Sequence, residues 1–245
     1  MGAGMSQASM PPGQPAGQSV MGALLDSFNV LHEPTAVFTR VKERPRILVP
    51  WLTVSVFMMV YGFLLRPYQH AAMQALSASL PPETAARMNS GDSVLGVLFL
   101  PVILLIGLAA GSGLLALGVA LTGAQARYKT LMSVLAYASS TTVIFWVVTI
   151  AVLTTRGVSQ VADLADVRAP IGLDMLAPGA GFYLGSVLNA INPLSVWGVW
   201  LAGTGIAVTH GISRATGIVI TAFAYLICVA IQFAPLIFLS MALKR

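Results

Sequence analysis

Long stretches without a charged residue are the feature that most limits what this chain can fold into. Five of them lack Asp, Glu, Lys and Arg, and each is long enough, or nearly so, to cross a bilayer as a helix, which takes roughly 20 mainly apolar residues. With 57% hydrophobic and 9% charged residues, the chain has more apolar surface than a water-soluble globule hides, since soluble domains carry roughly 25% charge. The sequence therefore predicts an all-α integral membrane protein, a bundle of about five transmembrane helices with short interfacial helices. The predicted spans are 47–65, 93–122, 130–155, 194–209 and 215–243.

Composition also predicts the regions around the spans. Residues 1–27 begin with uncharged Gly-, Ser-, Gln- and Pro-rich sequence and are expected to form a disordered cytoplasmic tail, followed by one transmembrane domain over 28–245. Residues 175–193 are uncharged and glycine-containing, and we expect a re-entrant or interfacial segment rather than a sixth span. After the first span, apolar residues recur at helical spacing between Tyr68 and Leu80, which predicts a short amphipathic helix on the membrane surface.

Basic residues cluster before the first span. Pro34 is suited to begin a helix there. A basic interfacial helix at this position would bind anionic lipid head groups. The alternative is that these charges only anchor the first span on the cytoplasmic side, as the positive-inside rule describes. The candidate head-group ligands are Arg40, Lys42, Arg44 and Arg46.

The distribution of basic residues predicts the orientation of the chain. An amino terminus in the cytoplasm places seven basic residues on that side and six on the other, including Arg156 and Arg168. Because these numbers are nearly equal, the dense basic cluster before the first span decides the prediction. We expect the amino terminus inside and the carboxyl terminus outside.

Small residues repeat along single faces of the predicted helices. In a bilayer, helices associate through close backbone approach, which favours such faces. One face of the fourth span carries Ser195, Gly198, Ala202, Gly205 and Thr209, and one face of the second carries Gly107, Gly111 and Gly118. We expect Gly205→Leu to disrupt the protein and Leu201→Ala to be tolerated. Periodicity leaves open whether these faces meet within one chain or between copies of a homo-oligomer.

The predicted spans contain little that supports chemistry. No ionisable Asp, Glu, Lys or Arg lies within them, which argues against ion-coupled transport. Gln232 is the most polar side chain in a span, and it fits a hydrogen bond between helices better than a substrate contact. The histidines are isolated, the single cysteine excludes a cysteine cluster within one chain, and no nucleophile elbow occurs, so we expect no enzyme activity, no cofactor and no metal. The basic residues are dispersed between spans, which argues against nucleic acid as a partner.

Three short motifs resemble the Yip1-domain family of membrane proteins, in particular its bacterial branch. They are PTAVFTRVK at residues 34–42 before a span opening at Pro50, NPLSVW at 192–197, and AGTGIAVTH at 202–210 followed by Ser213 and Arg214. The resemblance implies five spans, a cytoplasmic amino terminus, no known catalysis and, for the bacterial branch, the cytoplasmic (inner) membrane. Eukaryotic members are associated with small GTPases through a longer cytoplasmic region and an acidic motif, which this sequence lacks.

Small-residue faces, interfacial helices and the shortage of reactive groups together favour a non-enzymatic scaffold or accessory subunit. Its expected partners are membrane lipids, further copies of the chain or other membrane proteins. The alternative is a channel or facilitator for a small or lipidic solute, which Pro101, Pro235 and the glycines of 179–185 favour because they can break helices at depth. Five spans do not divide into two equal repeats, which lowers this second interpretation.

Overall fold

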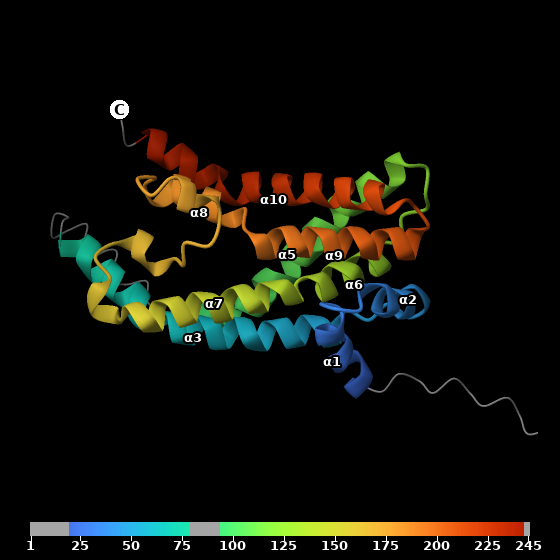
Figure 1. The fold of residues 1–245 in the computed structure, drawn as a ribbon, viewed down its shortest axis with the longest axis horizontal. Coiled ribbons are helices and arrows are strands. Elements are labelled where there is room, and N and C mark those ends of the chain that lie inside the picture. Colours follow the sequence, from blue (N-terminus) through green and yellow to red (C-terminus); the bar gives the residue numbers. More distant parts are fainter. Residues whose placement is uncertain (1–19, 79–93, 243–245) are drawn as a thin grey trace, which may run out of the picture.

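A computed structural model describes residues 20–78 and 94–242, and the regular elements of this part of the chain are all helices (Figure 1). The helices run mostly along the long axis of the molecule. In chain order they are α1 (Val20–Asn29), α2 (Pro34–Glu43), α3 (Leu48–Ala78), α5 (Val94–Leu121), α6 (Tyr128–Ala138), α7 (Ser140–Arg156), the 3-10 turns η2 (Val158–Gln160), η3 (Leu164–Val167) and η4 (Leu173–Leu176), α8 (Phe182–Ala190), α9 (Pro193–His210) and α10 (Arg214–Ala242).

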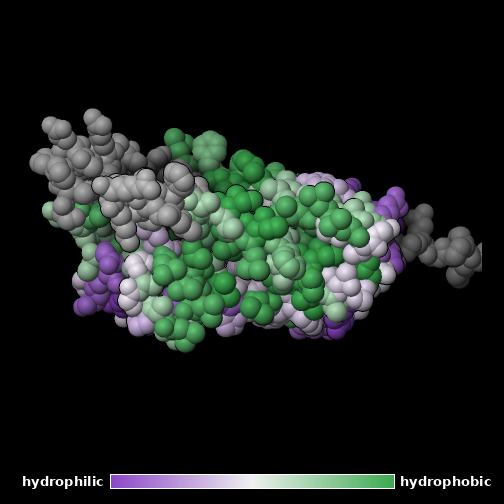
Figure 2. Space-filling model, turned by 90° about the horizontal axis from the view of Figure 1, so that it is seen from above, coloured by the Kyte–Doolittle hydropathy of each residue, from purple (hydrophilic) through white to green (hydrophobic). Residues whose placement is uncertain are grey.

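Apolar surface covers the middle of the molecule and hydrophilic residues gather at its two ends (Figure 2). Within the described residues, α3, α5, α6 with α7, and α10 are each long and apolar enough to cross a membrane, and α8 with α9 forms a bent pair that passes the same test. Because α7 ends at one end of the bundle and α10 begins at the other, α8 and α9 carry the chain across between them (Figure 1). Four single helices and one bent pair of the described residues are therefore long and apolar enough to span a membrane, in agreement with the prediction of about five spans.

The first span is longer than predicted. α3 has 31 residues, or about 46 Å of helix at 1.5 Å per residue, so it extends beyond a hydrocarbon core of roughly 30 Å. The separate amphipathic helix predicted from Tyr68 onward is instead the last part of α3, and its final two residues lie outside the described residues. Tyr68 and Ala72 are buried there against Leu153 of α7 and Val161, which explains why the helix continues past Pro67.

The third span is interrupted near its middle. Ser139, between α6 and α7, has a ψ of −7°, whereas helical residues lie near −42°. Its hydroxyl donates to the carbonyl of Ala136 at 2.7 Å, and Thr141 donates to Ala138 at 3.2 Å. Serine and threonine hydroxyls compete for backbone carbonyls in this way, so the Ser-Ser-Thr-Thr run breaks a helix that hydropathy alone presents as continuous.

A second break separates α8 from α9, whose axes differ by 41°. Asn192 caps α9 by accepting from the amides of Leu194 (3.0 Å) and Ser195 (2.9 Å), and Pro193 occupies the first turn. This capping box starts a new helix where the chain bends. The segment 175–193, predicted to be re-entrant or interfacial, therefore becomes the last residues of η4, the helix α8 and the cap of α9.

The core surrounds α9, which packs against α10, α2, α6 and α7. Every residue from Leu201 to Ile206 is buried. The main apolar cluster adds Phe38 of α2, Leu115 of α5 and Tyr137 of α6. The structure therefore argues against the expectation that Leu201→Ala is tolerated. Leu201 does not face lipid, because α9 is enclosed on all sides at this depth.

The beginning of the chain differs from the predicted tail. Val20–Asn29 forms α1, so the part of 1–27 that the structure describes is helical rather than disordered. Asp26 of α1 and Arg40 of α2 form a bidentate ion pair, with Arg40 Nη2 at 2.5 Å from Asp26 Oδ1 and Nε at 3.2 Å from Oδ2. The hydrogen bond from Arg40 to this carboxylate raises the pKa of Arg40. The pair joins α1 to α2, while Val37, Phe38 and Val41 bury α2 in the core.

We expect Asp26→Ala to destabilise this end of the bundle by about 1–3 kcal/mol, below the roughly 3–5 kcal/mol of a fully buried pair because Arg40 keeps 36% of its side chain exposed. Glu43→Ala, which removes an exposed carboxylate of α2, is the control. Unfolding followed by circular dichroism in mixed micelles measures the difference. Equal stabilities of the two variants would contradict a structural role for the pair.

Candidate functional site

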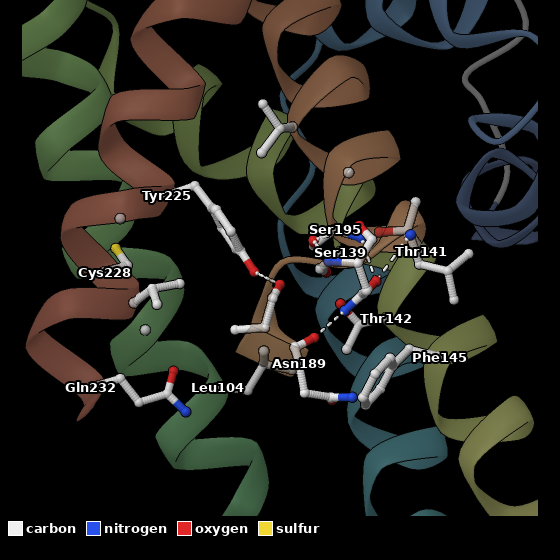
Figure 3. A pocket seen from close by; sticks show the side chains of 18 of the residues that line it. Leu104, Ser139, Thr141, Thr142, Phe145, Asn189, Ser195, Tyr225, Cys228 and Gln232 are labelled. Carbon is white, nitrogen blue, oxygen red and sulfur yellow. Dashed lines mark hydrogen bonds between the residues drawn. The ribbon is translucent and has the colours of Figure 1, made fainter. Parts of the chain in front are cut away.

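A cavity of about 910 Å³ lies inside the bundle, beside the two helix breaks (Figure 3). Residues from α3, α5, α6, α7, η3, α8, α9 and α10 line it, and most of them are apolar. Pockets for small ligands have volumes of roughly 300–1,000 Å³ and are mainly apolar with a few placed polar groups. The cavity has the size and lining of a ligand site.

The cavity is closed toward the packed core and open at its side. Leu115 of α5 and Ala202 of α9 line its inner end and belong to the main buried cluster. Gly107 of α5 and Gln232 of α10 also line it, yet both are exposed. An opening therefore lies between α5 and α10, on the apolar flank of the bundle, and Gln69 of α3 is a further exposed residue of the lining.

Gln232 lies at this opening, and the side chains of Cys228 and Gln232 project from α10 toward the cavity (Figure 3). Among the described residues, the structure records no interhelical hydrogen bond from Gln232. At this position the side chain can also reach an occupant of the cavity, and the hydrogen bond between helices expected from the sequence stays a prediction.

Polar groups of the cavity wall come mainly from the broken helices. Ser139 lies at the α6–α7 break, and Asn189 and Asn192 lie at the α8–α9 break. Asn189 donates to the carbonyl of Ala169 at 2.7 Å and to Asp174 Oδ2 at 3.0 Å, and Asn192 donates to the carbonyl of Asn189 at 2.9 Å. These bonds attach the loop of η3 and η4 to α8, so the loop forms a fixed part of the wall.

Arg168, directly after η3, is the one cation among the lining residues. Its guanidinium carbon lies 5.6 Å from the centre of the Phe182 ring, and Nη1 is 3.3 Å from Ser186 Oγ on α8. The sequence presented this residue only as a charge in an outer loop. No spacing rule links Arg168 to α8, because the folding of the loop alone brings them together.

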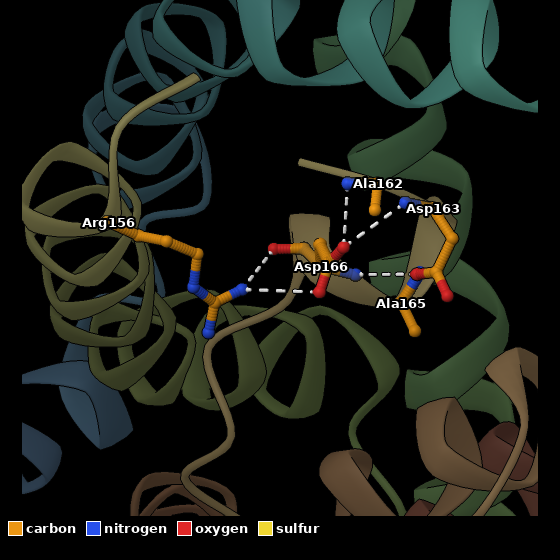
Figure 4. A network of polar contacts seen from close by, with 5 residues as sticks. All are labelled: Arg156, Ala162, Asp163, Ala165 and Asp166. Carbon is orange, nitrogen blue, oxygen red and sulfur yellow. Dashed lines mark hydrogen bonds and ion pairs between the residues drawn. The ribbon is translucent and has the colours of Figure 1, made fainter. Parts of the chain in front are cut away.

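The acidic residues of the same loop stabilise η3 (Figure 4). Asp163 accepts from the amides of Ala165 (2.6 Å) and Asp166 (3.1 Å), and Asp166 Oδ2 accepts from those of Ala162 (2.8 Å) and Asp163 (3.1 Å). Arg156 Nη1 donates to the carbonyl of Asp166 at 2.6 Å and lies 3.9 Å from its Oδ1. This network joins the end of α7 to the loop that carries Arg168.

The predicted packing residues have different surroundings. A Cβ on Gly111 would lie 2.9 Å from Leu135, one on Gly198 would lie 2.8 Å from Thr141 Oγ1, and one on Gly118 would collide with Ile220. Ala202 is buried, and Gly205 faces Val134 and Phe38. Gly107 differs, because no atom lies within 4 Å of its Cβ position; it belongs to the cavity opening rather than to a helix contact within the chain.

The helices α9 and α10 meet backbone to backbone at Gly203 and Gly217, and Gly203 does not belong to the small-residue face predicted for the fourth span. A Cβ on Gly203 of α9 would lie 2.6 Å from the Cα of Ile218 in α10, and one on Gly217 would collide with the carbonyl of Gly203. The fourteen-residue separation of these two glycines shows no periodicity. A sequence signal for this contact does exist: α9 contains Gly-Thr-Gly, and α10 contains a Thr-Gly pair. The short turn at Gly211 brings the two helices side by side, and the φ of Gly211, +70°, suits glycine.

The predicted head-group ligands are divided by the structure. Arg40 donates to Asp26, as described above, and keeps 36% of its side chain exposed, so its role as a lipid ligand stays a prediction. Lys42 and Arg44 are exposed at the end of α2. Arg46 is half-buried, and its backbone carbonyl accepts from Ser133 Oγ at 2.8 Å.

Comparison with known proteins relates this fold to one family. The family model described as the Yip1 domain matches residues 28–234. No curated protein and no solved structure matches the chain.

Proposed function

The chain belongs to the Yip1 domain family, and we propose that it is a non-enzymatic accessory protein of the membrane that holds a lipid or another amphiphile inside its helix bundle. Yip1 is not known as an enzyme family. The observation that carries the proposal is the cavity of about 910 Å³, mainly apolar and open toward the apolar flank between α5 and α10. Such an opening admits a molecule from the bilayer rather than from water.

The same geometry favours a holding function over a channel. The inner end of the cavity meets the main buried cluster, in which Phe38, Leu115 and Tyr137 are almost fully buried. A channel would need a second opening through this cluster, which is close-packed and contains residues from α2, α5, α6, α9 and α10. Binding from the side needs no such rearrangement.

We place the end that carries α1, α2 and the α9–α10 turn on the cytoplasmic side of the inner membrane. Seven basic residues belong to this end, and basic residues near spans favour the cytoplasm. The loop with η3 and η4 and the end of α10 then lie on the opposite side (Figure 1). In this arrangement Lys42 and Arg44 are exposed toward cytoplasmic lipid head groups.

Lipid binding in the cavity is tested by blocking the opening of the cavity. Gly107→Trp adds a large side chain at the rim, where no neighbour occupies the Cβ position, so the fold should be retained while the cavity is filled or closed. We expect at least about a tenfold loss of bound palmitoyl-oleoyl phosphatidylcholine, or roughly 1.4 kcal/mol. Native mass spectrometry after exchange into detergent doped with this lipid measures it, and also counts the copies of the chain in each assembly.

Gly96→Trp is the matched control for this experiment. Gly96 is also exposed and also without a neighbour at its Cβ position, and it lies eleven residues earlier, about three turns along the same face of α5, outside the cavity lining. It should retain lipid as the unmodified protein does. Equal retention by both variants would overturn the proposal that the cavity holds the lipid.

A further inference from the structure

We propose that Arg168 binds the acidic head group of the amphiphile, so that the cavity selects a phospholipid whose head group has a net negative charge over a zwitterionic one. This inference rests on the proposed function, since it assumes an occupant in the cavity. It adds the chemical class of that occupant and the residue that recognises it. Three observations support it: the way the guanidinium is fixed, its lack of a counter-ion among the described residues, and its place relative to the apolar part of the cavity.

The guanidinium of Arg168 occupies a prepared place on α8. A Cβ on Gly185 would lie 2.6 Å from both Nη1 and Nη2, so only glycine leaves room for the planar group against the helix. Phe182 stacks with it at 5.6 Å, and Ser186 accepts from Nη1 at 3.3 Å. A cation held by a ring and a hydroxyl is positioned in advance, and a preorganised donor loses little conformational freedom when an anion binds.

No carboxylate of the described residues neutralises this cation. The nearby Asp163 and Asp166 accept from backbone amides of η3, Asp166 also lies beside Arg156, and Asp174 accepts from the amide of Gly172 at 2.9 Å and from Asn189. Arg168 Nε is buried and has no acceptor in the described part of the chain. A buried donor without an acceptor is costly, and an anion that accepts from Nε and Nη would offset the cost.

The position of Arg168 suits an amphiphile better than a small free anion. Arg168 follows η3 at the end of the bundle where α7 ends, and the cavity lining also includes apolar residues such as Leu104 and Val229 and the exposed Gly107 and Gln232. A head group at Arg168 would lie near the membrane surface, with its acyl chain in the apolar part. A free phosphate would leave that part empty.

The experiment compares three probes on the full-length protein in nonionic detergent. They are phosphatidylglycerol, phosphatidylcholine with the same acyl chains, and glycerol 1-phosphate, a small anionic phosphate ester without acyl chains. Native mass spectrometry measures retention by the unmodified protein and by Arg168→Gln. We expect the unmodified protein to prefer phosphatidylglycerol over phosphatidylcholine by about tenfold, Arg168→Gln to lose this preference while still binding phosphatidylcholine, and glycerol 1-phosphate to bind to neither.

Lys129→Gln is the control, because it removes an exposed cation of α6 that does not line the cavity. It should keep the preference, and circular dichroism should show both variants folded. Equal retention of the two lipids by the unmodified protein, or an unchanged preference in Arg168→Gln, would overturn the head-group assignment and leave lipid holding intact. Failure of Gly107→Trp to reduce either lipid would instead overturn the holding function. Binding of glycerol 1-phosphate at comparable affinity would assign the site to a free anion and overturn the proposed lipid selectivity.

Discussion

Replacing Gly203 or Gly217 by leucine is expected to destabilise this protein more than any other substitution considered. Each glycine faces the backbone of the opposite helix, Gly203 at 2.6 Å from the Cα of Ile218 and Gly217 against the carbonyl of Gly203. A backbone atom cannot rotate away as a side chain can, so α9 and α10 would have to separate along the contact that encloses the core. We expect a loss of about 3 kcal/mol or more, at or above the usual range for overpacking.

Gly113→Leu is the control for this prediction. Gly113 lies within α5, no atom lies within 4 Å of its Cβ position, and replacing glycine in a helix removes a conformational penalty of roughly 0.5–1 kcal/mol. It should be neutral or slightly stabilising. Unfolding in mixed micelles, followed by tryptophan fluorescence, gives the free energies. A Gly203→Leu protein as stable as Gly113→Leu would show that the two helices do not cross as closely as described.

A smaller effect is expected at the contact between α2 and α9. A Cβ on Gly205 would lie 2.6 Å from Val134 and 2.9 Å from the ring of Phe38, both of which are fully buried. Because these neighbours are side chains, they can shift, and we expect Gly205→Leu to cost about 1–3 kcal/mol and to displace α2 from the bundle. Limited proteolysis between α2 and α3 should become faster, together with the drop in unfolding free energy.

Leu201→Ala tests the enclosed position of α9 by removing side-chain atoms instead of adding them. Leu201 is fully buried in the main cluster, so its truncation leaves a cavity and should cost about 2–5 kcal/mol. It should leave α2 in place, since Gly205 and Phe38 are unchanged. A Leu201→Ala protein with unchanged stability would support the sequence-based expectation that this substitution is tolerated, and would contradict the central position of α9.

Hydropathy was sufficient to predict the spans because it depends on the solvent, not on the neighbours of a residue. A long charge-free run must satisfy its backbone groups internally in lipid, and helices do so without tertiary contacts. The small residues at Gly111, Gly198 and Gly205 followed from the same reasoning, since they mark faces where helices meet. Gly107 has the same spacing, but no neighbouring atom lies near its Cβ position. Periodicity identifies which face of a helix packs, and it does not say along what length of that face a second helix stays in contact.

The sequence alone thus determined an all-helical membrane protein, about five segments long and apolar enough to span a membrane, and its family. Only the tertiary structure decided that α9 is the enclosed centre, that Gly203 and Gly217 touch, that Arg40 is paired with Asp26, and that Arg168 lies in the wall of a cavity. The physical reason is the range of the interactions. Membrane insertion and helix formation are decided by consecutive residues. The cavity instead lies between α5 and α10 and beside a distant loop that folds onto α8. Both features depend on contacts between groups far apart in the chain.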